Sequence, residues 1–520
     1  MTDSTHSQQL QHRKVRGVLL LGGLVGITWV LAGWILTGAS DRLVLTALGI
    51  VGVLIMLTIL RDWRTGCYLF IVWLLFEDLA RKYLGNNMVI YFGKDVLVGV
   101  TYLAFFLEWQ KGKEPTIRPK FLLPLMLFLW LGIAQMFNSN SPSLMYGLLG
   151  AKMYFFYIPL MWVGYALLRD EKDIQPFLYI NMGLAGVIAL LGSIQAIAGP
   201  GFLNPVDLAP DIQLLSTLQR VSPITGQVVF RPTSVFVSDG RFALYLFLMW
   251  VLGFGAAGYL LLRTRRGRKL IFLAIGLVTA AIVLSGARAT LLYTGASALV
   301  MAAAFLWGAP WKWGQAYRSV RAIRRAFLLA AVGVVALLVF YPEALGARWA
   351  FYSESLSPDS PTSEVGWRTW GYPIKNLELA FEHKEWMYGY GIGTSSLGVQ
   401  YVSRWLGEKP LEIGVESGFG TLIVEMGILG LLLWLVWVFA ALRACWQVVR
   451  GLRGTVFFPV AFAIFWFALL LLVPFTYMGM QPYQNFVLNA YLWLLLGVLF
   501  RLPKLLEQGQ SEAAVAAAQP

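Results

Sequence analysis

The sequence is poor in charge, in cysteine and in histidine. Only 13% of its 520 residues are charged and 58% are hydrophobic, whereas about a quarter of the residues in soluble domains are charged. This composition, with a mean hydropathy of +0.67, excludes an ordinary soluble domain and indicates a polytopic membrane protein. Because a segment in lipid must satisfy its own backbone hydrogen bonds, we expect an all-α fold.

The two cysteines, Cys67 and Cys445, each lie near an expected cytoplasmic loop, so we expect no disulfide. Two of the three histidines, His6 and His12, precede the first apolar run. Only His383 lies further along the chain. A catalytic site that uses histidine could therefore contain only His383.

The net charge of +14 does not indicate a nucleic-acid partner, because the basic residues occur in short loops between nearly uncharged apolar runs. By the positive-inside rule these loops are cytoplasmic. About fourteen spanning helices place every cluster on one side of the membrane and both termini in the cytoplasm. The clusters are Arg13, Lys14, Arg16; Arg61, Arg64; Lys111, Lys113, Arg118, Lys120; Arg169, Lys172; Arg263, Arg265, Arg266, Arg268, Lys269; Lys312, Arg318, Arg321, Arg324, Arg325; Arg443, Arg450, Arg453; and Arg501, Lys504.

This topology predicts that the longest polar segments lie on the side of the membrane opposite the cytoplasm. The expected spans are 17–38, 43–60, 66–80, 89–108, 121–137, 144–168, 175–198, 241–262, 270–286, 288–308, 326–341, 418–442, 456–476 and 483–501. The chain then divides into N-terminal helices (1–198), central helices with the outer loop 199–240 (199–341), a large periplasmic loop (342–417), C-terminal helices (418–501) and a cytoplasmic tail (502–520).

The loop 342–417 is the one long polar interruption of an apolar chain. Loops of this length are usually functional or disordered, and disordered segments are poor in aromatic residues. This loop is rich in them, so we expect it to fold into short helices and to carry part of an active site. Its aromatic residues include Trp349, Phe351, Tyr352, Trp367, Trp370, Tyr372, Phe381, Trp386, Tyr388 and Tyr390.

A small group of cations does not fit the positive-inside rule. These residues lie at outer helix ends, inside spans or on the large loop, where a charge is costly and usually functional. Guanidinium forks and lysine ammonium groups bind phosphate oxygens, and a diphosphate leaving group needs its developing charge stabilised. We therefore expect these cations to bind a diphosphate. They are Lys94, Lys152, Arg231, Arg241, Arg288 and Arg368.

Most of these cations also have a purely structural alternative. The alternative partners are Asp95 for Lys94, an acid on a neighbouring helix for Lys152, and Asp239 for Arg231 or Arg241. Arg288 has no acid within a dozen residues on either side, so we expect its partner to come from elsewhere in the fold or from a ligand.

Three patches of the sequence resemble the O-antigen ligase and polysaccharide polymerase superfamily of bacterial envelope enzymes. The first is FRPTSVFVSDGRFALYL at 230–246, and the second is SGARATLL at 285–292. The third is GYGIGTSS at 389–396, followed by ESGFGTLIVEMGILGLLLWL at 416–435. The resemblance covers about 220–440, whereas the first 200 residues agree only in being helical.

Such enzymes move a sugar chain from an undecaprenyl diphosphate carrier to an acceptor at the periplasmic face, without a nucleotide sugar, a metal or another cofactor. The resemblance implies that Arg231 and Arg288 contact the diphosphate, with Arg288 acting in catalysis. Arg241 is a weaker candidate, and Lys152 and Arg368 are further cations of this site. The implied partners are the lipid-linked oligosaccharide, a glycan acceptor, the lipid bilayer and a chain-length regulator protein.

The sequence departs from the family at the start of the helix that contains Glu425. Family ligases have a histidine there, and the matching residue in this chain is Glu416. Glu416 is expected either to orient or deprotonate the acceptor hydroxyl or to cap the helix. Glu425 lies deeper in the span, where it can act near the acceptor or pair with Lys152 or Arg288. His383 matches a histidine that is not catalytic in the family, and the missing histidine favours a chain polymerase over a ligase to lipid A–core.

Two other functions remain open. A flippase for a lipid-linked sugar also needs buried cations, but it would show internal repeats and interrupted helices, and no repeat is visible. A different polyprenyl-sugar glycosyltransferase would need an acidic pair on its first outer loop, which here spans about 39–42 with the single acid Asp41. A polymerase of O-antigen or exopolysaccharide is therefore the expected function.

Overall fold

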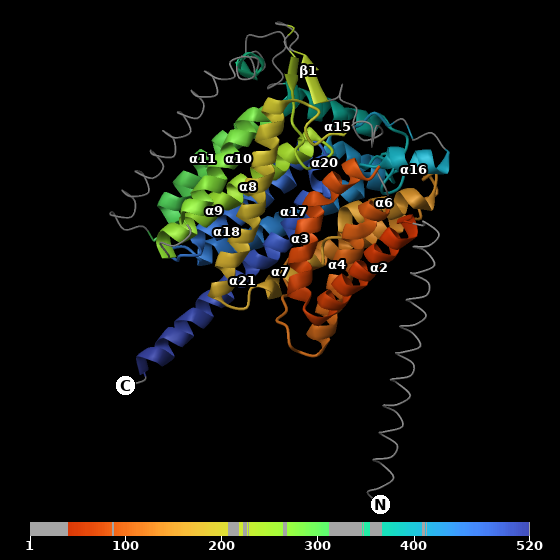
Figure 1. Cartoon of the computed structure of the whole chain (residues 1–520). Helices are drawn as coiled ribbons and strands as arrows, with labels where there is room; N and C mark the ends of the chain where they lie inside the picture. The colour runs from red at the N-terminus through yellow and green to blue at the C-terminus, as the bar shows by residue number, and fades with distance from the viewer. Residues whose placement is uncertain are drawn as a thin grey trace, which may run out of the picture.

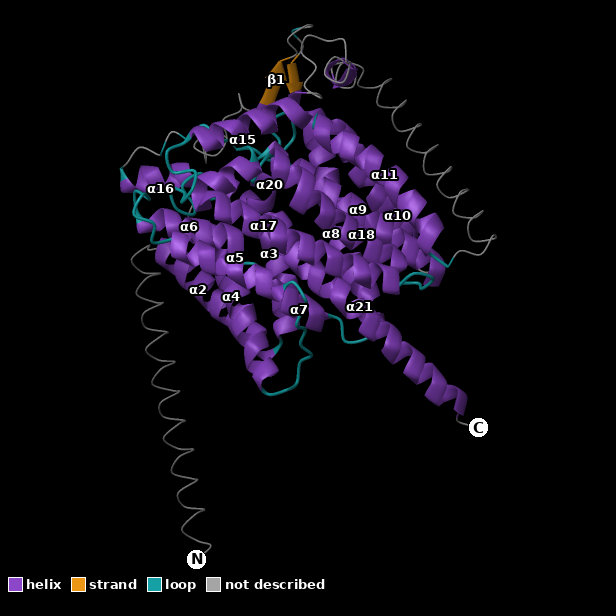
Figure 2. Ribbon diagram, turned by 180° about the vertical axis from the view of Figure 1, so that it is seen from behind, coloured by secondary structure: helices purple, strands orange, loops and turns teal. Residues whose placement is uncertain are grey.

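The computed structural model describes residues 40–85, 88–205, 218–221, 226, 228–263, 268–310, 346, 348–353, 367–407, 411 and 413–518. These residues are mostly helical, apart from one antiparallel pair of strands, β1 (Gln219–Val221) and β2 (Val228–Phe230) (Figures 1 and 2). The helices are α2 (Ser40–Arg61), α3 (Trp63–Tyr83), α4 (Met88–Gln110), α5 (Leu122–Gln135), α6 (Leu144–Phe155), α7 (Leu160–Leu167), η1 (Glu171–Asp173), α8 (Ile174–Ala198), α9 (Asp239–Arg263), α10 (Arg268–Leu284), α11 (Arg288–Gly308), η3 (Trp367–Gly371), α15 (Tyr372–Glu382), α16 (Val399–Leu406), α17 (Gly418–Gly451), α18 (Phe458–Leu470), η4 (Leu471–Phe475), α19 (Thr476–Met478), α20 (Gln481–Gln484) and α21 (Phe486–Ala518).

The long helices run between two opposite ends of a bundle. One end, which we call the hairpin face, carries β1, β2, α15, α16 and α20 (Figure 1). The other, the basic face, carries the connections 62–64, 111–121, 168–173 and 451–457. The first two of these are joined by the Arg64–Glu114 ion pair at 2.7 Å. The described members of the basic clusters therefore lie at one end of the bundle, as the positive-inside rule predicts.

The expected helical fold is confirmed for the described residues, and their apolar helices are consistent with a membrane protein. Within the described ranges, eight segments are long and apolar enough to cross a membrane, and α2 and α5 contain shorter apolar stretches. Two of the expected spans, 17–38 and 326–341, lie outside the described residues. The total of fourteen spans and the periplasmic side of the large loop stay predictions.

Several expected spans are interrupted. The span 144–168 consists of α6 and α7, separated by a turn at 156–159. Pro159 has no N–H for a helical hydrogen bond, which explains why the helix restarts after it. Similarly, α18 passes into the π-helical turn η4, which contains Pro474. In α17, Gly427 has φ 72° and ψ 179°, so two helical halves meet at a break.

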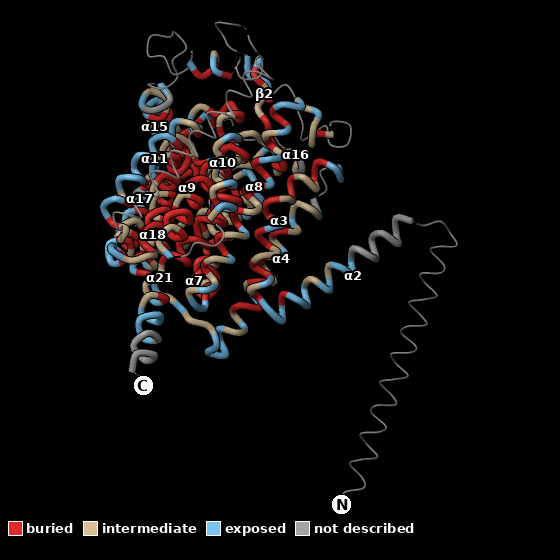
Figure 3. The backbone as a smooth tube through the Cα atoms, turned by 60° about the vertical axis from the view of Figure 1, so that its left-hand side comes forward, coloured by how far each residue is buried: buried red, intermediate tan, exposed pale blue. Residues whose placement is uncertain are grey.

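The core lies along α9, α17, α18 and α21, whose inner faces are buried (Figure 3). Small residues let two of the central helices approach closely. The space beside Gly164 of α7 is filled by the backbone of Leu494, and that beside Gly497 of α21 by the backbone of Met161. By contrast, α2 lies at the edge of the bundle and exposes most of its described side chains.

The two faces should be accessible from opposite sides of a membrane. Lys384 on the hairpin face and Lys120 on the basic face are both exposed. A membrane-impermeant maleimide applied to sealed membranes should label only one of the single variants Lys384→Cys and Lys120→Cys. The native cysteines, Cys67 and Cys445, are buried and provide a low background in the unmodified protein. Equal labelling of both variants from one side would contradict this topology.

Candidate functional site

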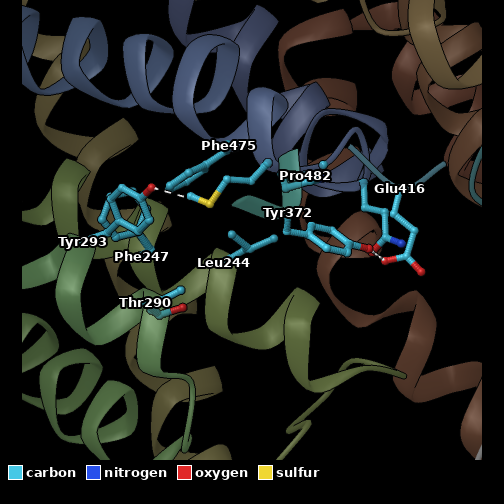
Figure 4. Close-up of a pocket in the computed structure, with 12 residues that line it drawn as sticks. Leu244, Phe247, Thr290, Tyr293, Tyr372, Glu416, Phe475 and Pro482 are labelled. Atoms are coloured by element: carbon cyan, nitrogen blue, oxygen red, sulfur yellow. Dashed lines mark hydrogen bonds between the residues drawn. The ribbon is translucent and has the colours of Figure 1, made fainter. Parts of the chain in front are cut away.

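A cavity of about 260 Å³ opens between the hairpin-face ends of α9 and α11 and the segment 475–482. Figure 4 shows that its walls are largely apolar and that a tyrosine and a carboxylate lie together at one end. We call it the Glu416 cavity. Its lining residues are Leu244, Phe247, Ala289, Thr290, Tyr293, Tyr372, Glu416, Phe475, Met478, Gly479, Gln481 and Pro482.

Aromatic packing builds the apolar wall. The ring of Phe475 lies 4.7 Å from that of Tyr293 and 5.5 Å from that of Phe247, measured between centroids. These residues come from η4, α11 and α9, so three elements distant in sequence meet here. The wall is thus apolar, whereas Glu416 at one end of the cavity is an exposed residue.

Helix α15 holds Glu416 in place. The Tyr372 hydroxyl donates a hydrogen bond to Oε2 of Glu416. The backbone N–H of Glu416 donates to Oδ1 of Asn376, one turn further along α15, at 2.8 Å. Ser417 is the N-cap of α17, and its hydroxyl accepts from the N–H of Gly420 at 3.2 Å. The capping role is thus filled by Ser417, and the Glu416 carboxylate faces the cavity.

Glu425 is fully buried, and no ion pair joins it to Lys152 or Arg288 in the described part of the chain. Its carboxylate accepts from the Ser396 hydroxyl at 2.8 Å, from the Ser395 N–H at 2.8 Å and from the Tyr154 hydroxyl at 2.9 Å. The expected pairing with Lys152 or Arg288 is therefore wrong. Glu425 instead fastens the segment 389–397 to the bundle.

The break in α17 also helps to attach the segment 386–391 to the bundle. The carbonyls of Val424 and Glu425 accept hydrogen bonds from the N–H groups of Tyr390 at 2.7 Å and Gly391 at 3.1 Å, and the N–H of Ile428 donates to the Trp386 carbonyl at 3.1 Å. Gly427 adopts positive φ, where its hydrogen faces the Met387 backbone and a side chain would collide. The glycine-rich turn is thus bound to the helix by its backbone.

Three of the expected phosphate-binding cations, Lys94, Lys152 and Arg241, belong to a largely buried network of charges instead. Lys152 pairs with Asp95 at 2.6 Å. Arg241 pairs with Asp78 at 2.8 Å and lies over the Phe486 ring at 4.3 Å. Asp95 therefore pairs with Lys152 and not with Lys94, its neighbour in sequence, which was the structural alternative for Lys94.

The sequence analysis missed the rest of this network. Glu77 pairs with Lys94 at 2.8 Å, and Asp78 pairs with Arg81 at 3.2 Å as well as with Arg241. Lys82 is fully buried and donates to the Thr233 hydroxyl at 2.9 Å and the Ser234 carbonyl at 3.0 Å. The signal was present in the run EDLARK at 77–82, which places four charges at the end of an apolar span.

Arg231 and Arg288 lie around the turn that joins α10 to α11. Arg231 pairs with Asp239 at 2.6 Å, which was its structural alternative. Its Cγ lies against Gly286 of the turn. The Arg288 guanidinium lies 4.6 Å from the centre of the Phe351 ring. Arg288 directly precedes Ala289 and Thr290, which line the Glu416 cavity, but Arg288 is not itself one of the lining residues.

Tyr352 and Arg348 also lie at the turn between α10 and α11. The Tyr352 hydroxyl donates to the Val283 carbonyl at 3.0 Å. Burial raises the pKa of Tyr352 to about 12, while Arg348, Arg231 and Arg288 act in the opposite direction and lower it. Arg348 lies at the same turn, because it donates to the Leu284 carbonyl at 2.9 Å and to the Phe230 carbonyl at 3.1 Å.

Two further predicted residues lie away from this group. Nε2 of His383 is 2.9 Å from the Ile413 carbonyl, so His383 supports the segment that leads to Glu416. Arg368 lies in η3, and its side chain is outside the part that the structure describes. The structure thus separates the expected site into the Glu416 cavity, the arginines beside it and the buried charge network.

No protein-family model matches the chain, and no curated protein matches its sequence. Fold and composition define the class as a helical membrane protein with a cavity near one face. The resemblance to the O-antigen ligase and polymerase superfamily stays a prediction from the residues.

The buried charge network should be essential for stability. Asp78→Ala would leave Arg81 and Arg241 buried without their shared carboxylate, and breaking a buried ion pair in this way costs about 3–5 kcal/mol. We therefore expect a clearly lower midpoint of thermal unfolding in detergent. Glu378→Ala removes an exposed carboxylate from α15 and provides the matched control, with an effect within about 0.5 kcal/mol. Equal midpoints for the two variants would show that the network does not stabilise the fold.

Proposed function

We propose that the protein is a membrane glycosyltransferase that transfers or polymerises glycan from an undecaprenyl diphosphate carrier, as an O-antigen or exopolysaccharide polymerase does. The observation that carries this proposal is the Glu416 cavity, in which a carboxylate held by Tyr372 lies at one end of a largely apolar wall. We place the reaction at the hairpin face, which would be the periplasmic side of a bacterial inner membrane.

In the proposed reaction, an acceptor hydroxyl attacks the anomeric carbon of the lipid-linked sugar. Its proton passes to the Glu416 carboxylate while the glycosidic bond forms. The bond from the anomeric carbon to the diphosphate oxygen breaks, and undecaprenyl diphosphate leaves with the electron pair. The negative charge that develops on the leaving group is then stabilised by a nearby cation.

Arg288 is the best-placed cation for that role. It begins α11, directly before the cavity-lining residues Ala289 and Thr290, and the Arg231 side chain lies against Gly286 of the preceding turn. Guanidinium groups bind phosphate oxygens through parallel N–H donors. Lys152 and Arg241 support the proposal less, because each is held by an acid in the buried network.

One observation favours the alternative of a lipid-linked sugar transporter. Transporters commonly have discontinuous spanning helices, whose free ends bind the cargo or its coupling ion, and α17 is discontinuous at Gly427. Here, however, the segment 386–391 of the same chain occupies that break and bonds to its backbone groups. The break is therefore better explained as an attachment point for the loop than as a cargo site.

The proposed function predicts that Glu416 is required for glycan transfer. Glu416→Gln keeps the size of the side chain and one oxygen that can accept from Tyr372 but cannot take a proton, so the rate should fall by about two to four decades. The assay is the lengthening of a purified undecaprenyl-diphosphate-linked repeat unit, with amounts of protein matched between variants.

The control for this experiment is Glu378→Gln, which changes an exposed carboxylate on α15 and should leave the rate unchanged. Equal unfolding midpoints would exclude misfolding as the cause of a loss in Glu416→Gln. Full transfer by Glu416→Gln would reject Glu416 as the base.

A further inference from the structure

Tyr372 lies at the start of α15 and lines the Glu416 cavity beside Glu416 (Figure 4). Its hydroxyl donates to Oε2 of Glu416, and the side chain itself lines the cavity. Pro373 follows it at a helix start, where proline's fixed φ favours the helical turn and costs no hydrogen bond. The position of the tyrosine ring is thus fixed by the way α15 begins.

The backbone around this contact is held as firmly as the side chains. Asn376 is largely buried, and its two polar atoms bridge α15 and the segment before α17. Its Nδ2 donates to the Tyr372 carbonyl at 2.9 Å, and its Oδ1 accepts from the N–H of Glu416 at 2.8 Å. Two residues further on, Gly418 packs against the carbonyl of Thr476, which leaves no room for a side chain.

A carboxylate that takes a proton must present one oxygen to the acceptor in a fixed direction. A hydrogen bond to the other oxygen selects one rotamer and removes the entropy of the free side chain. In this site the bond goes to Oε2, which leaves Oε1 as the oxygen for the acceptor hydroxyl.

We propose that Tyr372 is a positioning residue for glycan transfer, which orients the Glu416 carboxylate toward the acceptor through its hydroxyl. This inference rests on the proposed function and adds to it a residue from the large loop. It also explains why α15, which begins the second half of that loop, is bound to the residues just before α17.

The test is Tyr372→Phe, which removes the hydroxyl and keeps the ring. Hydrogen bonds to charged groups contribute enough that kcat should fall by about 10- to 100-fold, while the KM for the lipid-linked donor should change little. A purely structural contact would instead lower the unfolding midpoint and leave kcat of the folded protein unchanged. Tyr388→Phe, which changes an exposed tyrosine on the same face, is the matched control.

A double-mutant cycle tests whether Tyr372 acts through Glu416. Because the two residues are in contact, their effects should not add, and Tyr372→Phe should cause no further loss in a Glu416→Gln background. A kcat for Tyr372→Phe equal to that of the unmodified protein would overturn the positioning role, as would independent, multiplying losses in the double variant. Absence of transfer by the unmodified protein would instead contradict the proposed function, and the positioning role with it.

Discussion

Backbone hydrogen bonding inside the bundle determines where the hairpin-face loop can sit. A membrane helix cannot leave its carbonyl and N–H groups unsatisfied in lipid, and α17 breaks at Gly427. The segment 386–391 closes that break, and Glu425 binds the following serines. The loop is thereby anchored at a point buried in the bundle. That anchor in turn holds α15 and the residues before α17 next to the cavity.

The buried charges impose a second constraint on the same face. Acids and cations from α3, α4, α6 and α9 satisfy one another around Tyr91 and Phe486, so most of the charge at this depth has a structural partner. Such pairs are expensive to bury and are damaging when half of the pair is lost. The cations beside the Glu416 cavity are therefore a smaller set than the sequence suggested, centred on Arg288 and Arg231.

Much of the fold was predictable, because hydropathy and loop charge reflect the requirements of the bilayer directly. The places of the apolar helices and the common side of the described basic clusters follow from those patterns, but α17 and α21 continue to Gly451 and Ala518, beyond the ends expected for their spans. The breaks at Pro159 and Gly427 were not predicted, since a single proline or glycine in a long apolar run does not say whether the chain elsewhere can satisfy the exposed backbone.

The site was predictable in part for a related reason. The exceptions to the positive-inside rule identified Arg288 and Lys152 as candidate site residues. Which acid each cation pairs with depends, however, on contacts between helices that are distant in sequence. Lys152 and Asp95 are 57 residues apart in sequence, and Tyr154 and Glu425 are 271 apart. The acid–tyrosine contact between Glu416 and Tyr372 has no periodic or motif signature, so only the folded loop reveals it.

The central claim is that the Glu416 cavity catalyses transfer of a glycan. The most direct measurement uses the purified protein in vesicles with an undecaprenyl-diphosphate-linked oligosaccharide, and records both the length of the glycan and the leaflet in which the lipid lies. The proposal predicts longer glycan chains and release of undecaprenyl diphosphate without any nucleotide sugar. Movement of the lipid between leaflets with no change in glycan length would contradict it and would support a transporter.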